Sequence, residues 1–283
     1  MSTPRYRTQT GMFACGVIFS FGVLLNSILG FFLDTWLDIL VALSILPTFS
    51  FFVWYFVPSK SCGSQLSDEL LAEIIDESSQ NFNSENKEDI AKELLVTKII
   101  KIFSRKRTRR VVLRMFFLWM FIGMYYFALL LPVDLPGNTL VNNVLTAAME
   151  GFGALCMVFV VNMVWCYRTV LIGKGCLLAG ICSLGSAIVI LIKVESADFS
   201  VNLIILVLQY TTFFAVSAVF ALLFVYTGEM FPTDIRATCF AICSLGGRFG
   251  SLIAPQIAKL GFISAGIPKI VFSLLMFAVY RIW

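Results

Sequence analysis

The chain of 283 residues contains no histidine and few charged residues. The missing histidine excludes imidazole metal ligands, histidine-based catalytic triads and imidazole proton relays. Asp, Glu, Lys and Arg make up 13% of the chain, which is about half of the charged fraction of soluble domains. Because 59% of the residues are hydrophobic, the composition predicts a polytopic membrane protein.

The apolar residues gather in stretches of membrane-spanning length. A helix of ~20 residues crosses the hydrocarbon core, and the chain has apolar stretches of about this size at 11–33, 37–57, 112–133, 141–162, 172–192, 201–226, 236–258 and 264–282. Their length and the lack of alternating polarity indicate helices. We therefore predict an all-α membrane protein with about eight transmembrane helices.

The orientation follows from the distribution of lysine and arginine, which favour cytoplasmic loops. If the N-terminus is cytoplasmic, the opposite side of the membrane receives only Lys193, Lys259 and Lys269 of the 21 basic residues. This bias predicts that both termini are cytoplasmic. The net charge of +4 reflects the same bias, so it does not predict a nucleic-acid partner.

The cysteines do not have the positions that disulfides need. Cys62 falls in a predicted cytoplasmic loop, and the others lie in or beside apolar stretches, at Cys15, Cys156, Cys166, Cys176, Cys182, Cys239 and Cys243. Structural disulfides are therefore not expected. The chain has neither a cysteine pair with metal-binding spacing nor a glycine-rich nucleotide loop. We predict no catalytic residues, no metal site and no cofactor, and the chain is not expected to be an enzyme.

The segment 58–111 is the only sizeable polar part of the chain. It contains two amphipathic stretches, 66–77 and 84–103, and then the basic run KIFSRKRTRR at 101–110. The amphipathic spacing predicts a helical cytoplasmic loop. The basic run fits the positive-inside rule, with attraction to anionic lipids as a consequence, and a nuclear address is the alternative. We divide the chain into 1–57, this loop and 112–283.

Two ionisable residues fall deep inside predicted spans. Glu150 lies ~15 Å from either face of the membrane, and Arg248 lies ~18–21 Å from the cytoplasmic turn. A charge at that depth costs at least ~2.5–3.5 kcal/mol on insertion scales. One interpretation is that both residues line a substrate or ion pathway. The other is a structural pair between Glu150 and Arg248.

Further polar and small residues share these spans. Gly246 and Gly250 form a small-xxx-small pair beside Arg248, which is typical of close helix packing. Tyr125 and Tyr126 lie too deep for an interfacial belt, so they either contact neighbouring helices or stack on an organic substrate. Polar residues in spans, such as Gln209, commonly form helix–helix hydrogen bonds.

The sequence YTGEMFPTDIRATCFAICSLGGRFGSLIAP at 226–255 resembles a long, specific motif of the organic cation/anion transporters, solute carrier family 22 of the major facilitator superfamily. In that family the motif covers the end of the tenth span, a cytoplasmic turn and the eleventh span. LRMFFLWMFIGMYYFALLL and VNNVLTAAMEGFGA are similar to the seventh and eighth spans, and the sequence from 21 to 58 is similar to the fifth and sixth.

The resemblance implies a truncated major facilitator fold. Two spans would come from the N-terminal bundle and six would form a complete C-terminal bundle, with the first four spans missing. In this family the substrate lies near the midplane between the bundles. Two motifs depart from the family pattern: residues 162–168 lack the acidic and glycine positions of the gating motif after the eighth span, and 57–63 shortens the segment after the sixth.

The resemblance also implies a function. We expect a transporter of small organic ions, working by alternating access in the lipid bilayer of the plasma membrane. The alternative is a truncated or degenerate relative that does not transport and associates with full-length members. The residues expected to line the substrate cavity are Arg248, Glu150, Tyr125, Tyr126 and Gln209. Arg248 favours organic anions or zwitterions, because the matching position is acidic in cation-selective members. Glu229, Arg236 and Arg168 match a charge network that gates the cytoplasmic side.

Overall fold

The computed structural model describes residues 13–33, 35–45, 104, 106–131, 136–161, 167–192, 199–262 and 264–282, and the regular elements within these ranges are all helices. The chain divides into two units. One unit comprises Met1–Phe31 and Ile102–Trp283, and the other comprises Phe32–Lys101. The two amphipathic stretches predicted at 66–77 and 84–103 lie outside the described residues.

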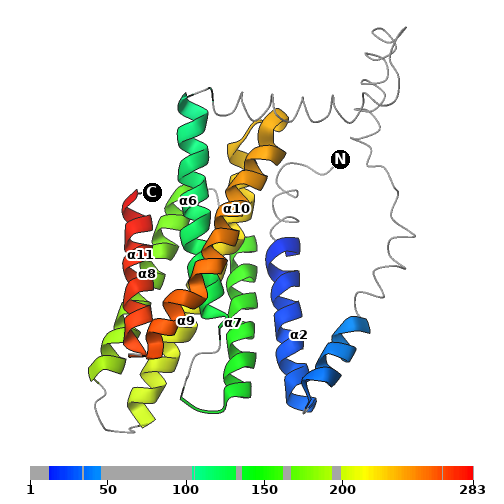
Figure 1. Ribbon diagram of the computed structural model, residues 1–283, viewed down its shortest axis with the longest axis vertical. Helices are drawn as coiled ribbons and strands as arrows, with labels where there is room; N and C mark the ends of the chain where they lie inside the picture. Colours follow the sequence, from blue (N-terminus) through cyan, green and yellow to red (C-terminus); the bar gives the residue numbers. More distant parts are fainter. Residues whose placement is uncertain are drawn as a thin grey trace. The chain divides into compact units, whose positions relative to one another are not determined.

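The first unit consists of helices that follow the predicted spans (Figure 1). They are η1 (Phe13–Ile18), α2 (Phe19–Phe32), α6 (Lys106–Leu129), α7 (Thr139–Val160), α8 (Arg168–Ile192), α9 (Phe199–Met230), α10 (Thr233–Ala258), η2 (Lys259–Phe262) and α11 (Gly266–Ile282). In the second unit, Trp36–Ile45 is a further apolar helix, whose first turn is capped by the Thr35 hydroxyl accepting from the Asp38 N–H at 3.3 Å.

Five of the described helices are long and apolar enough to cross a membrane. They are α6, α7, α8, α9 and α10 extended by η2, with the shorter apolar helices Gly16–Phe32 and Trp36–Ile45 in addition. The prediction of an all-α polytopic membrane protein is confirmed. Helix α6 begins at Lys106, so the end of the basic run belongs to the helix rather than to the loop before it.

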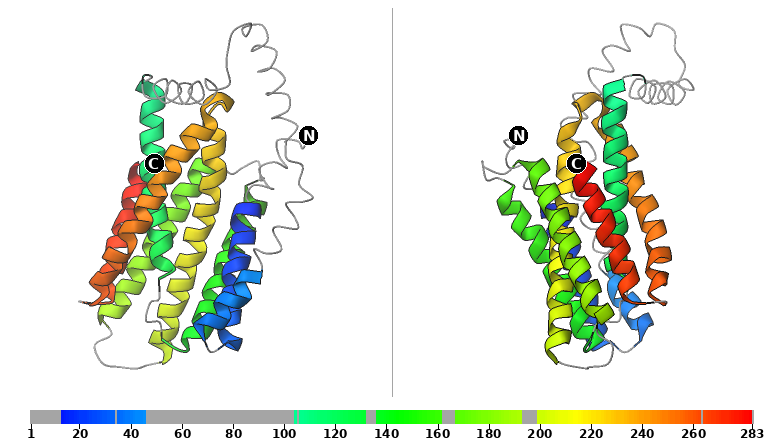
Figure 2. Two further views of the ribbon diagram at one scale, coloured as in Figure 1. Left: turned by 45° about the vertical axis from the view of Figure 1, so that its right-hand side comes forward. Right: turned by 90° about the vertical axis from the view of Figure 1, so that its left-hand side faces the viewer.

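Helix α9 contacts α6, α7, α8 and α10 and is the longest described element, with 32 residues. At 1.5 Å per residue it extends over about 48 Å, which exceeds the hydrocarbon thickness of ~30 Å. Its buried positions include small residues, among them Ala215, Ser217, Ala218 and Ala221. Small side chains let neighbouring helices approach, and α7, α8 and α9 run side by side in both views of Figure 2.

Helices α6 and α10 form the closest packing of the unit, and glycines on both make it possible. A Cβ atom at Gly123 on α6 would lie 3.0 Å from the Gly247 Cα on α10. A Cβ at Gly250 would overlap the Met120 carbonyl, and one at Gly246 would overlap the Phe116 carbonyl. This contact fixes the face of α10 that carries Arg248 relative to the face of α6 that carries Tyr126.

The start of α7 is held by polar contacts that keep Glu150 at a defined depth. Gly137 has a positive φ of 108°, which glycine adopts without steric penalty. The Asn138 side chain then caps the helix by accepting from the Leu140 N–H at 2.9 Å. Asn142 donates to the Pro136 carbonyl at 3.2 Å and accepts from the Tyr210 hydroxyl at 2.9 Å, which ties α7 to α9.

Candidate functional site

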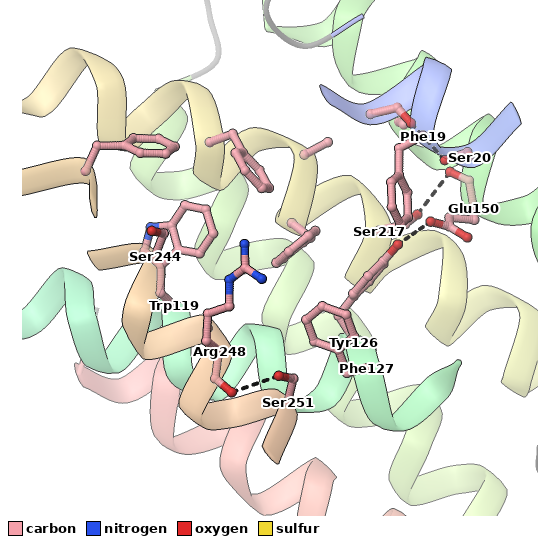
Figure 3. A pocket seen from close by; sticks show the side chains of 17 residues that line it. Phe19, Ser20, Trp119, Tyr126, Phe127, Glu150, Ser217, Ser244, Arg248 and Ser251 are labelled. Carbon is pink, nitrogen blue, oxygen red and sulfur yellow. Dashed lines mark hydrogen bonds between the residues drawn. The ribbon is translucent and has the colours of Figure 1, made fainter. Parts of the chain in front are cut away.

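A cavity of about 530 Å³ lies among η1, the start of α2, α6, α7, α9 and α10. We name it the aromatic cavity, because rings from four helices, α2, α6, α9 and α10, form much of its lining (Figure 3). It contains one carboxylate, from Glu150, and one guanidinium, from Arg248. These two residues come from α7 and α10, and both were predicted as charges inside membrane spans.

Glu150 is almost completely buried, with 2% of its surface exposed. The Tyr126 hydroxyl donates a hydrogen bond to its Oε1. Its Oε2 is the only buried side-chain nitrogen or oxygen without a partner among the described residues. Ser217 on α9 donates to the Glu150 carbonyl at 3.2 Å. An unsatisfied carboxylate oxygen is unfavourable in an apolar interior, so this atom offers an acceptor to a ligand in the cavity.

Arg248 extends from α10 into the same cavity, where its guanidinium lies apart from Glu150 (Figure 3). Its side chain is exposed, and within the described part of the chain it forms no ion pair. Ser251 donates to its backbone carbonyl at 2.7 Å, and its guanidinium forms no hydrogen bond with the residues that the structure describes. The structural pair between Glu150 and Arg248, one of the two interpretations of the sequence, is therefore not formed. The cavity presents separated charges of opposite sign.

Aromatic rings fill the wall between the two charges. The Trp119 ring makes edge contacts with Phe224 at a centroid distance of 4.7 Å and with Phe240 at 5.7 Å. Its indole N–H donates to the Thr227 hydroxyl on α9 at 2.9 Å, which holds the ring of this α6 residue in place. The Tyr126 ring is stacked on Phe220, with centroids 4.4 Å apart. The sequence did not predict these phenylalanines as cavity residues. The chain has 28 phenylalanines, and no spacing distinguishes the five that line the cavity.

The elements η1 and α2 supply a further part of the wall, through Gly16, Phe19 and Ser20. Gly16 lies in the π-helical turn η1, which packs on α7 and α9. A Cβ there would come within 3.0 Å of the Ala154 Cβ and 3.3 Å of the Ala221 Cβ. The glycine therefore allows this helix to close the cavity at short range.

Tyr125 and Gln209, which were also expected in the substrate cavity, lie elsewhere. Both line a second cavity, of about 250 Å³. Tyr125 is stacked on Phe272 with centroids 5.0 Å apart, and Gln209 accepts from Lys269 at 3.0 Å. Successive residues of an α-helix point about 100° apart, so Tyr125 and Tyr126 face different cavities. The structure thus brings together Arg248, Glu150 and Tyr126 and leaves Tyr125 and Gln209 out of this group.

The three residues expected in a cytoplasmic gate lie at the ends of α8, α9 and α10. Arg168 is the first residue of α8, and its guanidinium forms an ion pair with the Glu229 carboxylate near the end of α9. Both side chains are partly exposed, at 29% and 38%. Arg236 donates from Nε to the Phe231 carbonyl at 3.1 Å, which holds the turn between α9 and α10.

The described residues offer no metal centre, since no group of three or more Cys, Asp or Glu side chains comes together among them. Cys156, Cys176, Cys182, Cys239 and Cys243 are free thiols. In the aromatic cavity, the polar side-chain groups that a ligand could contact include the Glu150 carboxylate, the Arg248 guanidinium and a few hydroxyl groups.

Comparison with known proteins gives relatives of one kind. The chain is 26% identical over 273 residues to mouse solute carrier family 22 member 4, covering 89% of this chain and 46% of that protein. It is 24% identical over 303 residues to an organic cation transporter-like protein of Drosophila melanogaster, covering 96% and 50%. It is 25% identical over 267 residues to human organic cation/carnitine transporter 2, covering 90% and 46%. No family model matches the chain.

These relatives confirm the resemblance to solute carrier family 22 that the motif at 226–255 indicated. The homology extends over about nine-tenths of this chain, and the chain spans about half the length of the curated relatives it matches. Together with the apolar helices, it identifies a multi-pass membrane protein.

Proposed function

We propose, starting from its homology to solute carrier family 22, that this chain forms part of a transporter of small organic ions and that the aromatic cavity binds the transported ion. The observation that carries the proposal is the pair of separated, unpaired charges in one cavity: Glu150 with a partnerless Oε2 and Arg248 without a counter-ion among the described residues. Intramembrane charges of this kind mark ion and substrate pathways.

The Glu150 end of the cavity has the chemistry of a cation site. A carboxylate attracts an ammonium group, and aromatic faces add cation–π attraction of ~2 kcal/mol or more when the cation is desolvated. Tyr126 and Phe220 form a stacked pair beside the carboxylate. Glu150 Oε2 is the acceptor that a substituted ammonium group would use.

The Arg248 end has the chemistry of an anion site. A guanidinium offers two parallel N–H donors that match a carboxylate, and such bidentate pairs are among the strong hydrogen bonds. Since Arg248 is exposed to the cavity and not engaged by Glu150, these donors are available. A molecule with an ammonium group at one end and a carboxylate at the other would satisfy both ends, so the proposed substrate class is zwitterionic, with simple organic anions as a second group.

The ion pair between Arg168 at the start of α8 and Glu229 near the end of α9 supports a gate there. In an alternating-access cycle it would hold α8 and α9 together in one state and break in the other, while Arg236 keeps the α9–α10 turn rigid. Because the pair is partly exposed, its contribution to stability is small, which is what a reversible contact requires.

Uptake into cells expressing this chain tests the proposal. Labelled trimethylammonium carboxylates, organic cations and organic anions would be compared between the wild type and Arg248→Ala, with Arg114→Ala as the matched control, because Arg114 is an exposed arginine on α6 that does not line the cavity. We expect zwitterion uptake to fall only in Arg248→Ala. Robust uptake that is unchanged by Arg248→Ala would refute the assignment. No uptake of any probe would favour the non-transporting alternative.

A further inference from the structure

The second cavity, which we name the Lys269 cavity, is lined by Tyr125, Leu129, Gln209, Pro268, Lys269 and Phe272 among others. Its volume is about 250 Å³. No described residue lines both this cavity and the aromatic cavity. Tyr125 faces one and Tyr126 the other, so α6 separates them. The Lys269 cavity is therefore a second site and not an extension of the first.

Lys269 is a cation held only by neutral groups. Its Nζ donates to the Ser186 hydroxyl at 2.8 Å and to the Gln209 Oε1 at 3.0 Å. Ser186 and Gln209 are buried, with 0% and 4% of their surfaces exposed. Within the described ranges no carboxylate pairs with Lys269. The ammonium group has three N–H donors, and the third has no acceptor among these residues.

The surroundings of Lys269 make an uncompensated positive charge unfavourable. The residue is the fourth of α11, so it lies close to the positive end of that helix dipole. Its own backbone is fixed, because Ser183 on α8 donates to the Lys269 carbonyl at 3.0 Å. A cation held in this position, with no partner of opposite charge, attracts an anion.

Gln209 adds a second set of donors beside the lysine. Its Oε1 accepts from Lys269, and its amide nitrogen is a further donor. That nitrogen has no acceptor among the described residues, although Gln209 is almost fully buried and lines the cavity. Both residues line the cavity, so the third N–H of Lys269 and the amide N–H of Gln209 are the donors that a carboxylate there would use.

The rest of the cavity is apolar. Leu129, Pro268 and the stacked rings of Tyr125 and Phe272 line it. A hydrated inorganic anion gains nothing from these surfaces, whereas the hydrocarbon part of an organic anion does. We propose that the Lys269 cavity binds a small organic carboxylate, with its oxygens on Lys269 and Gln209 and its apolar part against Leu129 and Phe272. This proposal is independent of the function proposed for the aromatic cavity.

Equilibrium binding of radiolabelled benzoate to the purified full chain in nanodiscs tests the proposal. The measurements are made on an Arg248→Gln background, which removes the guanidinium of the aromatic cavity as a competing partner for a carboxylate. We expect benzoate to bind this variant and Lys269→Gln to weaken binding about tenfold or more, since a hydrogen bond to a charged group is lost. Lys269→Arg should restore part of the affinity. Lys259→Gln, which removes an exposed lysine outside the cavity, should have no effect.

Thermal unfolding of each variant, measured without ligand, separates loss of binding from loss of folding. If Lys269→Gln unfolds the chain, benzoate protection of the Arg248→Gln variant against thermal unfolding is the deciding measurement, and absence of protection overturns the proposal. Benzoate binding that is equal with Lys269 and with Gln at this position also overturns it. So does binding of chloride at this site without binding of benzoate.

Discussion

Gly250 on α10 lies against the backbone of α6, and its replacement by alanine tests the helix contact that positions the aromatic cavity. A methyl group at Gly250 would overlap the Met120 carbonyl oxygen and lie 2.8 Å from the Met124 nitrogen. Both are backbone atoms, so no change of rotamer relieves the overlap. Gly228 on α9 is the matched control, because a Cβ there meets nothing within 4 Å.

The expected change in the free energy of unfolding follows from two opposing effects. Alanine is favoured over glycine in a helix by ~1 kcal/mol at either position, whereas an inserted methyl group in a packed contact costs ~1–3 kcal/mol. The helix preference is common to both variants, so the difference between them isolates the packing cost. Gly250→Ala should therefore be less stable than Gly228→Ala by ~1–3 kcal/mol in free energy of unfolding.

Unfolding in mixed micelles with increasing SDS, followed by tryptophan fluorescence, measures this difference. Trp119, one of five tryptophans in the chain, is buried beside the contact and contributes to this signal. Equal stability of the two alanine variants would show that α6 and α10 do not approach as closely as the structure has them, and the placement of Arg248 relative to Tyr126 would then be wrong.

Three other predictions concern single contacts. Thr227→Val leaves the Trp119 N–H without its acceptor and should lower the free energy of unfolding by ~1–3 kcal/mol, whereas Thr227→Ser should be nearly neutral; equal losses would argue against this hydrogen bond. Tyr126→Phe keeps the stacked ring but removes the hydroxyl that donates to Glu150. It should lower the affinity for a cation, measured by calorimetry, with little change in the melting temperature. An unchanged affinity would contradict the role of this hydroxyl. Exchanging Arg168 and Glu229 keeps the ion pair, so uptake should fall in each single reversal and recover in the double one, and no recovery would contradict the gate.

The sequence predicted the membrane helices well because their signal is local. Apolar length alone identifies a span, and the described helices follow the predicted stretches from η1 to α11. The ends were less accurate: α6 begins inside the basic run, at Lys106, because arginine and lysine are good helix formers and nothing in the run stops the helix.

The candidate site was predicted only in part. Glu150 and Arg248 could be selected because a charge at membrane depth is rare, and the structure brings both to one cavity. Their separation could not be predicted, since it depends on helix rotation and on the glycine contact between α6 and α10. The same rotation places Tyr125 away from Tyr126. Lys269 was counted only as a flanking charge, because its partners Ser186 and Gln209 are distant in the sequence.

The affinity of the purified chain for two probes, choline and the longer betaine 4-(trimethylammonio)butyrate, tests the central proposal most directly. Both carry a trimethylammonium group, and only the betaine has a carboxylate, which three methylene groups separate from the ammonium. Glu150→Gln should weaken both by about tenfold or more, whereas Arg248→Gln should weaken betaine by a similar factor and leave choline unchanged. If Arg248→Gln leaves the affinity for betaine unchanged, or weakens both probes equally, the aromatic cavity is not a site with separate cation and anion ends.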